Sequence, residues 1–121
     1  MNLALWVCQA LLAAIFLASG SAKISQSKER MLATGQTGVA PFPLPVIRMT
    51  ALCELLAAFA LVIPWATRTA PLLTPIAACG LAVVMIGAAI SHSGLREPRN
   101  VLVNVGIMVV CVFVAYGRFA F

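Results

Sequence analysis

Charged residues are scarce in this sequence. They make up 9% of the 121 residues, whereas hydrophobic residues make up 63%. Soluble domains are usually about 45–50% apolar and about 25% charged. So few charges cannot cover a surface that faces water, which excludes an ordinary soluble domain. The length and composition together indicate one domain, residues 1–121, that is embedded in a membrane.

Several functional motifs are also missing. The four cysteines form no C-x-x-C pair, so the local signature of a thioredoxin-like dithiol site is absent, and we expect each cysteine to be a small buried side chain. No spacing of Cys and His suits zinc, and we expect no metal. The basic residues form no stripe interleaved with aromatic residues, so we expect no binding to nucleic acid.

Four long apolar runs remain, over residues 3–22, 45–65, 70–92 and 98–117. Each is near the roughly 20 residues that an α-helix needs to cross the hydrocarbon core of a bilayer. The alternation of about ten residues that marks a barrel strand is absent. The sequence therefore predicts an all-α membrane protein with four transmembrane helices in an antiparallel bundle.

The distribution of Lys and Arg predicts an orientation. Arg68 and Arg118 lie at one side of the predicted bundle. The opposite side carries Lys23, Lys28, Arg30, Arg96 and Arg99. Because cytoplasmic loops carry an excess of Lys and Arg, we expect the first and third loops in the cytoplasm and both termini outside.

Small residues recur along two of the predicted helices. Ala10, Ala14, Ala18 and Ala22 are four apart, and Gly80 and Gly87 are seven apart. Small side chains let membrane helices approach closely, since packing drives their association in lipid. We expect these residues to form seams within the bundle, with contact in a homo-oligomer as the alternative.

Polar residues gather in the cytoplasmic half of the predicted helices. Glu54 is nine residues past Pro45, or about 14 Å at the rise of an α-helix, which places it near the bilayer centre. Arg48 is about 5 Å inside the edge. In the opposite half, Gln9 is the main exception. Ionisable residues at such depths usually face the bundle interior or a watery cavity.

These residues predict a polar pocket. Its candidate ligand-binding residues are Lys23, Arg48, Glu54, His92, Arg99, Asn100 and Asn104. Glu54 and Arg48 point in different directions around their helix, so Lys23, His92 or Asn104 is the better partner for Glu54. Glu54 and His92 are the best candidates for catalysis. Alternatively, Glu54 only fixes helix register, through an interhelical hydrogen bond that contributes about 0.6 kcal/mol on average.

Three stretches resemble the DoxX-like family. They are "FLASGSAKI" at the end of the first helix, "RMTALCELLAAFALVIPW" in the second and "RNVLVNVGIMVVCVFVAYGRF" in the fourth. The resemblance implies a small four-helix protein of the bacterial inner membrane. Some relatives are associated with thiosulfate:quinone oxidoreduction or with thiol and oxidative-stress systems. The family offers no catalytic residues to carry over.

Three functions agree with these observations. The first is an accessory or binding subunit that holds a lipophilic ligand, such as a quinone, in the bilayer beside a membrane or peripheral redox protein. The second is a membrane enzyme in which Glu54, with His92 or Lys23, performs acid–base chemistry on a lipophilic substrate. The third is a chaperone or assembly factor whose polar cluster is structural.

Overall fold

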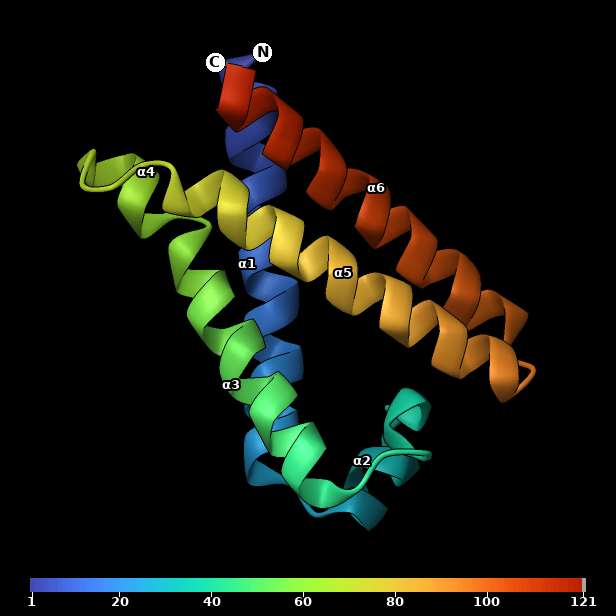
Figure 1. Cartoon of the computed structure of the whole chain (residues 1–121). Helices are drawn as coiled ribbons and strands as arrows, with labels where there is room; N and C mark the ends of the chain where they lie inside the picture. The colour runs from blue at the N-terminus through green and yellow to red at the C-terminus, as the bar shows by residue number, and fades with distance from the viewer. Residues whose placement is uncertain (121) are drawn as a thin grey trace.

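Helices are the only regular elements in the part that the structure describes, residues 1–120 of a computed structural model. Figure 1 shows the arrangement of the helices. The long helices are α1 (Asn2–Ser25), α3 (Leu44–Ala60), α5 (Leu73–Gly94) and α6 (Pro98–Ala120). The short elements are α2 (Lys28–Ala33), the 3-10 turn η1 (Thr37–Val39) and α4 (Ile63–Thr67). The four segments Asn2–Ser25, Leu44–Thr67, Leu73–Gly94 and Pro98–Ala120 are long and apolar enough to cross a membrane, which confirms the predicted class.

The second predicted helix is interrupted between α3 and α4. Pro64 has no N–H to donate to the carbonyl oxygen of Ala60, and its ring would clash with that carbonyl in a continuous helix. Thr74 Oγ1 donates to this Ala60 oxygen at 2.8 Å, and Gln9 Nε2 donates to the carbonyl oxygen of Leu61 at 2.6 Å. Side chains from α5 and α1 thus satisfy the carbonyl groups at the break, as a low-dielectric surrounding requires.

The helices form two antiparallel pairs. α1 packs mainly against α3, and α5 packs mainly against α6. In Figure 1 the pairs meet near the two termini and separate toward the other end, where the segment with α2 and η1 lies. The main core has contributions from all four long helices, including Phe16, Ala58, Leu81 and Val114. A second, smaller cluster of Met31, Val39 and Ile47 holds the α2–η1 segment against the start of α3.

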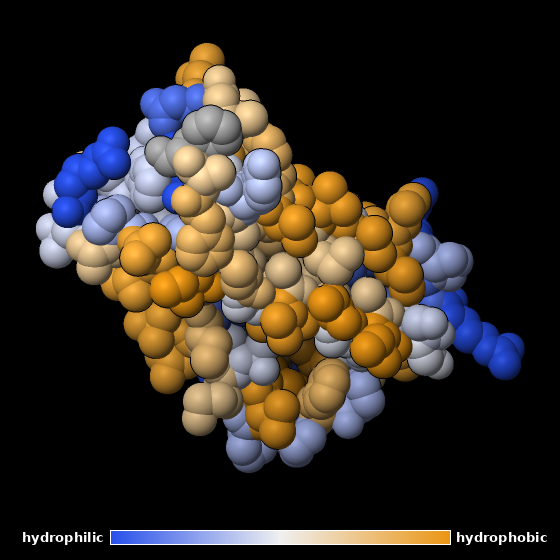
Figure 2. Space-filling view, turned by 45° about the horizontal axis from the view of Figure 1, so that its top comes forward, coloured by the Kyte–Doolittle hydropathy of each residue, from blue (hydrophilic) through white to orange (hydrophobic). Residues whose placement is uncertain are grey.

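The outer surface is apolar between the two ends of the molecule. Leu56, Val83, Leu102 and Val109 are among the many large apolar side chains that remain more than half exposed. Figure 2 shows apolar residues over the middle of the molecule and hydrophilic residues toward its ends. This pattern is suited to lipid around the helices and headgroups or water at the ends.

The predicted seams of small residues within the bundle were wrong, while contact in a homo-oligomer stays a prediction. The buried residues of α1 are Leu5, Gln9, Leu12, Ala13, Phe16 and Gly20, whereas Ala10, Ala14 and Ala18 are exposed and Ala22 is half-buried. A Cβ atom added at Gly80 or Gly87 would meet no atom of the described residues within 4 Å. The close approaches are at Gly20 against α3 and at Gly117 against Leu5 of α1. Spacing alone identified small residues on the helices but not the face that meets a neighbour.

The cysteines differ from the prediction in the same way. Cys111 is buried, Cys8 is half-buried, and Cys53 and Cys79 are exposed. All four are free thiols. The positions of Cys53 and Cys79 on the outer faces of α3 and α5 are exposed to lipid in a bilayer, so these two residues were wrongly expected to be buried.

Candidate functional site

A pocket of about 380 Å³ lies between the two helix pairs, at the end that carries η1. Each of the four long helices contributes to its wall, together with the segment around η1. Most of the lining is apolar, with Phe16, Val39, Ile47 and Met85 among the side chains. Its polar lining residues are Ser19, Lys23, Gln36, Thr50, His92 and Asn104. Small-molecule sites in proteins have this size and character, with a few polar groups in a mostly apolar wall.

A buried ion pair joins α1 to α3 beside this pocket. Lys23 Nζ lies 2.6 Å from Glu54 Oε1, and the Glu54 side chain is fully buried while that of Lys23 is 16% exposed. Lys23 lines the pocket and Glu54 does not. Glu54 Oε2 has no hydrogen-bond partner among residues 1–120. The ion pair keeps the carboxylate from being an isolated buried charge, which would be strongly destabilising.

Arg48 of α3 makes a second polar contact with α1. Its Nη1 donates a hydrogen bond to the carbonyl oxygen of Lys23, in the last turn of α1. A cation is favourable at this end of a helix, where the carbonyl groups carry partial negative charge. Arg48 is therefore placed against the backbone of α1 and not in the lining of the pocket.

Asn104 is the polar residue that α6 contributes to the pocket. It is 9% exposed, and its Nδ2 donates no hydrogen bond to any described residue. Leaving a buried donor unpaired costs about 1–3 kcal/mol, so native structures seldom do so without a reason. A ligand with an acceptor oxygen would remove this cost.

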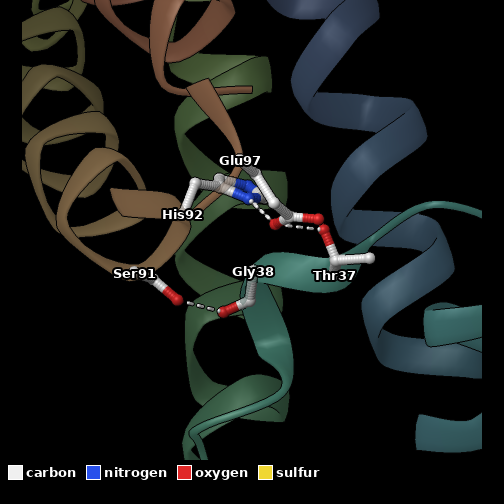
Figure 3. A network of polar contacts seen from close by, with 5 residues as sticks. All are labelled: Thr37, Gly38, Ser91, His92 and Glu97. Atoms are coloured by element: carbon white, nitrogen blue, oxygen red, sulfur yellow. Dashed lines mark hydrogen bonds and ion pairs between the residues drawn. The ribbon is translucent and has the colours of Figure 1, made fainter. Parts of the chain in front are cut away.

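His92 lies in the wall of the pocket as part of a hydrogen-bonded latch, shown in Figure 3. His92 Nδ1 donates to Glu97 Oε1 at 2.7 Å, and Thr37 Oγ1 donates to the same oxygen at 2.8 Å. Ser91 Oγ donates to the carbonyl oxygen of Gly38 at 2.7 Å. We use the name latch for these five residues, which attach η1 to the end of α5.

Two features of the latch depend on its geometry. A Cβ atom at Gly38 would lie 2.8 Å from His92 Nε2, so only glycine allows this approach of η1 to the imidazole ring. The hydrogen bonds from His92 and then from Thr37 lower the pKa of Glu97 below its ordinary value of 4.5, because they stabilise the charged carboxylate. Glu97 is in the short connection between α5 and α6, outside both helices.

The structure brings together part of the predicted set. Lys23, His92 and Asn104 line the pocket, whereas Arg48 and Glu54 lie behind its wall, in the contact between α1 and α3. Arg99 is exposed and Asn100 is half-buried in the first turn of α6, and neither lines the pocket. Among the described residues, no group of three His, Cys, Asp or Glu side chains could hold a metal ion.

The sequence prediction missed the latch partners of His92. Glu97 follows His92 by five residues across a tight connection, which was the available signal. Thr37 and Gly38 had no such signal, since the path of the chain between α2 and α3 decides where they lie.

The sequence model of the DoxX-like family matches residues 7–114, which include the pocket and the latch. The chain belongs to the DoxX-like family. No curated protein and no solved structure matches it. Family membership and the four membrane-spanning segments together make this DoxX-like protein a multi-pass membrane protein.

A second polar cluster of the DoxX-like protein lies at the end with the two termini. Arg118 of α6 is only 4% exposed; its Nε donates to Gln9 Oε1 at 2.6 Å and its Nη1 donates to Asn2 Oδ1 at 2.9 Å. Its guanidinium carbon lies 4.5 Å from the centre of the Trp65 ring. The sequence identified Gln9 as an exception but gave no sign that Arg118 is buried beside it.

Proposed function

We propose that this DoxX-like protein binds a lipophilic molecule through an acceptor oxygen in the pocket between its helix pairs. The observation that carries the proposal is the buried, unpaired Nδ2 of Asn104 in a mostly apolar lining. A cavity left by imperfect packing would not need an unpaired buried donor, because such a donor is destabilising.

The polar groups of the pocket define the chemistry of the ligand. Lys23 Nζ has three N–H groups and uses one for Glu54, so it can donate to a ligand as well. Glu54 balances the charge of Lys23, which makes a neutral ligand preferable to an anion. Gln36 adds a buried acceptor, because its Oε1 has no donor among the described residues. Two donors, this acceptor and an apolar wall favour a neutral molecule with carbonyl, ether or hydroxyl oxygens. A quinone is one such molecule, and a volume of about 380 Å³ is enough for a ring of that size.

Binding is favoured over acid–base catalysis by the positions of the titratable groups. A catalytic acid or base must come within hydrogen-bonding distance of the reacting atom. Glu54 lies behind Lys23. The Nδ1 of His92 is engaged by Glu97, and its Nε2 packs so closely on Gly38 that a Cβ atom there would lie 2.8 Å away. The pocket thus presents hydrogen-bond donors to a ligand more readily than a proton-accepting base, which favours an accessory or ligand-binding subunit over an enzyme.

The proposal includes a location and a partner. The basic residues near the α2–η1 segment and near the α5–α6 connection favour a cytoplasmic position for both in a bacterial inner membrane. The family resemblance favours a redox protein of the membrane or its surface as the partner. Single cysteines at Ser27 and Ser93, in a cysteine-free background, should react with an impermeant reagent only after the membrane is broken. Labelling in intact cells would reverse the orientation.

The test of ligand binding compares two asparagines of α6. The wild type, Asn104→Leu and Asn100→Leu are purified in a mild neutral detergent, and mass spectrometry identifies lipophilic molecules that co-purify. A short-chain ubiquinone then serves as a defined probe, with binding measured by equilibrium dialysis.

The Asn104→Leu substitution should remove the co-purifying molecule or weaken the probe about tenfold, the equivalent of about 1.4 kcal/mol. Asn100→Leu changes the same residue type one turn away, outside the lining, and should bind as the wild type does. Equal retention of the same molecule by Asn104→Leu would contradict the proposal.

A further inference from the structure

The end of the protein that holds the termini has positive charge without acidic side chains to balance it. The sequence contains three acidic residues, Glu29, Glu54 and Glu97. They lie in α2, in the contact between α3 and α1, and in the α5–α6 connection, all in the other half of the molecule. Arg68 and Arg118 therefore lie at an end where the described part of the chain supplies no carboxylate side chain.

Arg118 is held there as a buried cation with unused donors. A guanidinium carries five N–H groups, and Gln9 and Asn2 accept two of them. Its Nη2 is buried and has no hydrogen-bond partner within residues 1–120. An arginine that served only to reach the bilayer surface would extend its charged group into water. The 4% exposure of Arg118 is inconsistent with that role.

Arg68 places a second guanidinium beside the first. Its guanidinium carbon lies 5.1 Å from the centre of the Trp65 ring, the same ring that Arg118 contacts at 4.5 Å. Arg68 ends α4 in the left-handed region, with φ of 58°, and its side chain is exposed. Two like charges at one aromatic ring repel each other, so an anion between them would be stabilising.

A hollow of about 300 Å³ lies at these residues. Its lining consists of Met1, Asn2, Trp65, Arg68 and Arg118. The first two residues of the chain and the end of α6 are adjacent at this point, in agreement with the neighbouring termini in Figure 1. The hollow thus combines two arginines, an amide and an indole at one end of the membrane-spanning helices.

We propose that this hollow binds a phosphate group. Arginine forms bidentate, charge-assisted hydrogen bonds with phosphate oxygens, and its planar group can do so while it stacks on an aromatic ring. Tryptophan is enriched at the level of lipid headgroups, which is where the ends of membrane-spanning helices lie. The phosphate comes from a lipid headgroup or from free phosphate. The site is separate from the lipophile pocket, and neither proposal depends on the other.

The two tryptophans of the chain make the site directly observable. Trp65 and Trp6 are the only tryptophans in the sequence, and the Arg118 guanidinium carbon lies 5.5 Å from the Trp6 ring centre. Intrinsic tryptophan fluorescence of the full-length protein therefore reports on this cluster alone. The protein is held in a neutral, phosphate-free detergent and titrated separately with dioctanoyl phosphatidylglycerol, inorganic phosphate and dioctanoylglycerol.

We expect a saturable fluorescence change with phosphatidylglycerol and none with dioctanoylglycerol, which has the same acyl chains but no phosphate. A saturable change with inorganic phosphate as well would assign the site to free phosphate and support the phosphate chemistry. An equal change with dioctanoylglycerol, or no change with either phosphate compound, would overturn the proposal.

Two substitutions at the site and one control locate the effect. Arg68→Gln changes an exposed side chain and should raise the apparent Kd about fivefold or more, the usual contribution of one basic residue to an anionic headgroup. Arg96→Gln is the matched control, because Arg96 is also exposed and also has φ of 58°, but lies at the other end. Arg118→Lys should keep the charge and weaken binding through loss of the bidentate geometry. Equal affinity in wild type and Arg68→Gln would overturn the proposal, whatever Arg118→Lys does.

Discussion

At the end of the molecule with α2 and η1, the buried carboxylate of Glu54 pairs with Lys23, whereas at the end with the termini the buried guanidinium of Arg118 contacts amide oxygens and tryptophan rings. The first arrangement balances charge within the chain. The second leaves a net positive charge that nothing in the described part of the chain neutralises.

This difference indicates what each end is suited to bind. A neutralised ion pair beside an apolar pocket offers hydrogen bonds without a strong field, which suits a neutral lipophile. An unbalanced guanidinium pair has a field that favours an anion. The delocalised guanidinium is also the cation that tolerates such burial best, since it is weakly hydrated and stacks on aromatic rings.

The largest expected effect comes from breaking the ion pair. Glu54→Leu leaves Lys23 without its partner and should lower the free energy of unfolding by about 3–5 kcal/mol. Unfolding by SDS in mixed micelles with a neutral detergent measures this loss. The double substitution Lys23→Met/Glu54→Leu should recover most of it, and a double variant no more stable than Glu54→Leu would show that the pair does not act as a unit.

Glu54→Gln separates charge from hydrogen bonding at the same position. The glutamine can still accept a hydrogen bond from Lys23. We therefore expect the free energy of unfolding, measured in the same SDS experiment, to fall less than for Glu54→Leu. If the lipophile site functions by acid–base chemistry, this variant should fold and yet be inactive. Full function of Glu54→Gln would exclude a proton-transfer role for the carboxyl group.

Disrupting the cluster around Arg118 should lower the free energy of unfolding by a smaller amount. Arg118→Leu leaves the buried Gln9 Oε1 without its donor and should lower the free energy of unfolding by about 2 kcal/mol. The exposed Arg68→Gln variant should stay within about 0.5 kcal/mol of the wild type in the same SDS experiment. A loss for Arg118→Leu as large as that for Glu54→Leu would contradict the distinction between the two ends.

The helix spacing at each end can be tested with alanine. A Cβ atom at Gly20 would lie 3.1 Å from the carbonyl oxygen of Ala51, and one at Gly117 would lie 2.9 Å from Cδ1 of the fully buried Leu5. Gly20→Ala and Gly117→Ala should each lower the free energy of unfolding by about 1–3 kcal/mol, a typical cost of overpacking. Gly80→Ala, with open space at its Cβ position among the described residues, should be neutral or stabilising.

The smallest effect should be the pH dependence of the latch. The folded pKa of Glu97 is below the ordinary 4.5. The stabilisation that its charged carboxylate gives the latch is therefore fully present above pH 4.5 and is lost as the pH falls through the lowered pKa. A spin label on a cysteine at Thr34 should become more mobile in that range below pH 4.5, as η1 leaves α5. Glu97→Gln should have no such step, and a step of equal size in that variant would assign the transition to another group.

The membrane class and the number of helices could be predicted from sequence, because bilayer thickness sets the length of an apolar run. The break between α3 and α4 had a signal in Pro64, although the expected helix continued through it. The α2 helix and the η1 turn were not expected, since short elements are held in place by tertiary contacts such as the cluster of Met31, Val39 and Ile47.

The candidate site was predictable in part, because the sequence gives the depth of each residue along its helix. Depth along the chain identified Lys23 among the possible partners of Glu54, and the structure places it there. Depth does not give the rotation of a helix about its axis. Arg48 therefore lies against the α1 backbone, while Arg99 and Asn100 lie outside the pocket lining, although all three share the predicted level with its residues.

The sequence by itself determined the membrane environment, the four spans and the gathering of polar residues in one half of the predicted bundle. These follow from composition and from the fixed rise of a helix. Only the tertiary structure decided which polar groups meet. The divergence of the two helix pairs creates the pocket at Asn104, and the return of α6 to the start of α1 buries Arg118 beside Gln9, because such contacts depend on helix rotation and crossing.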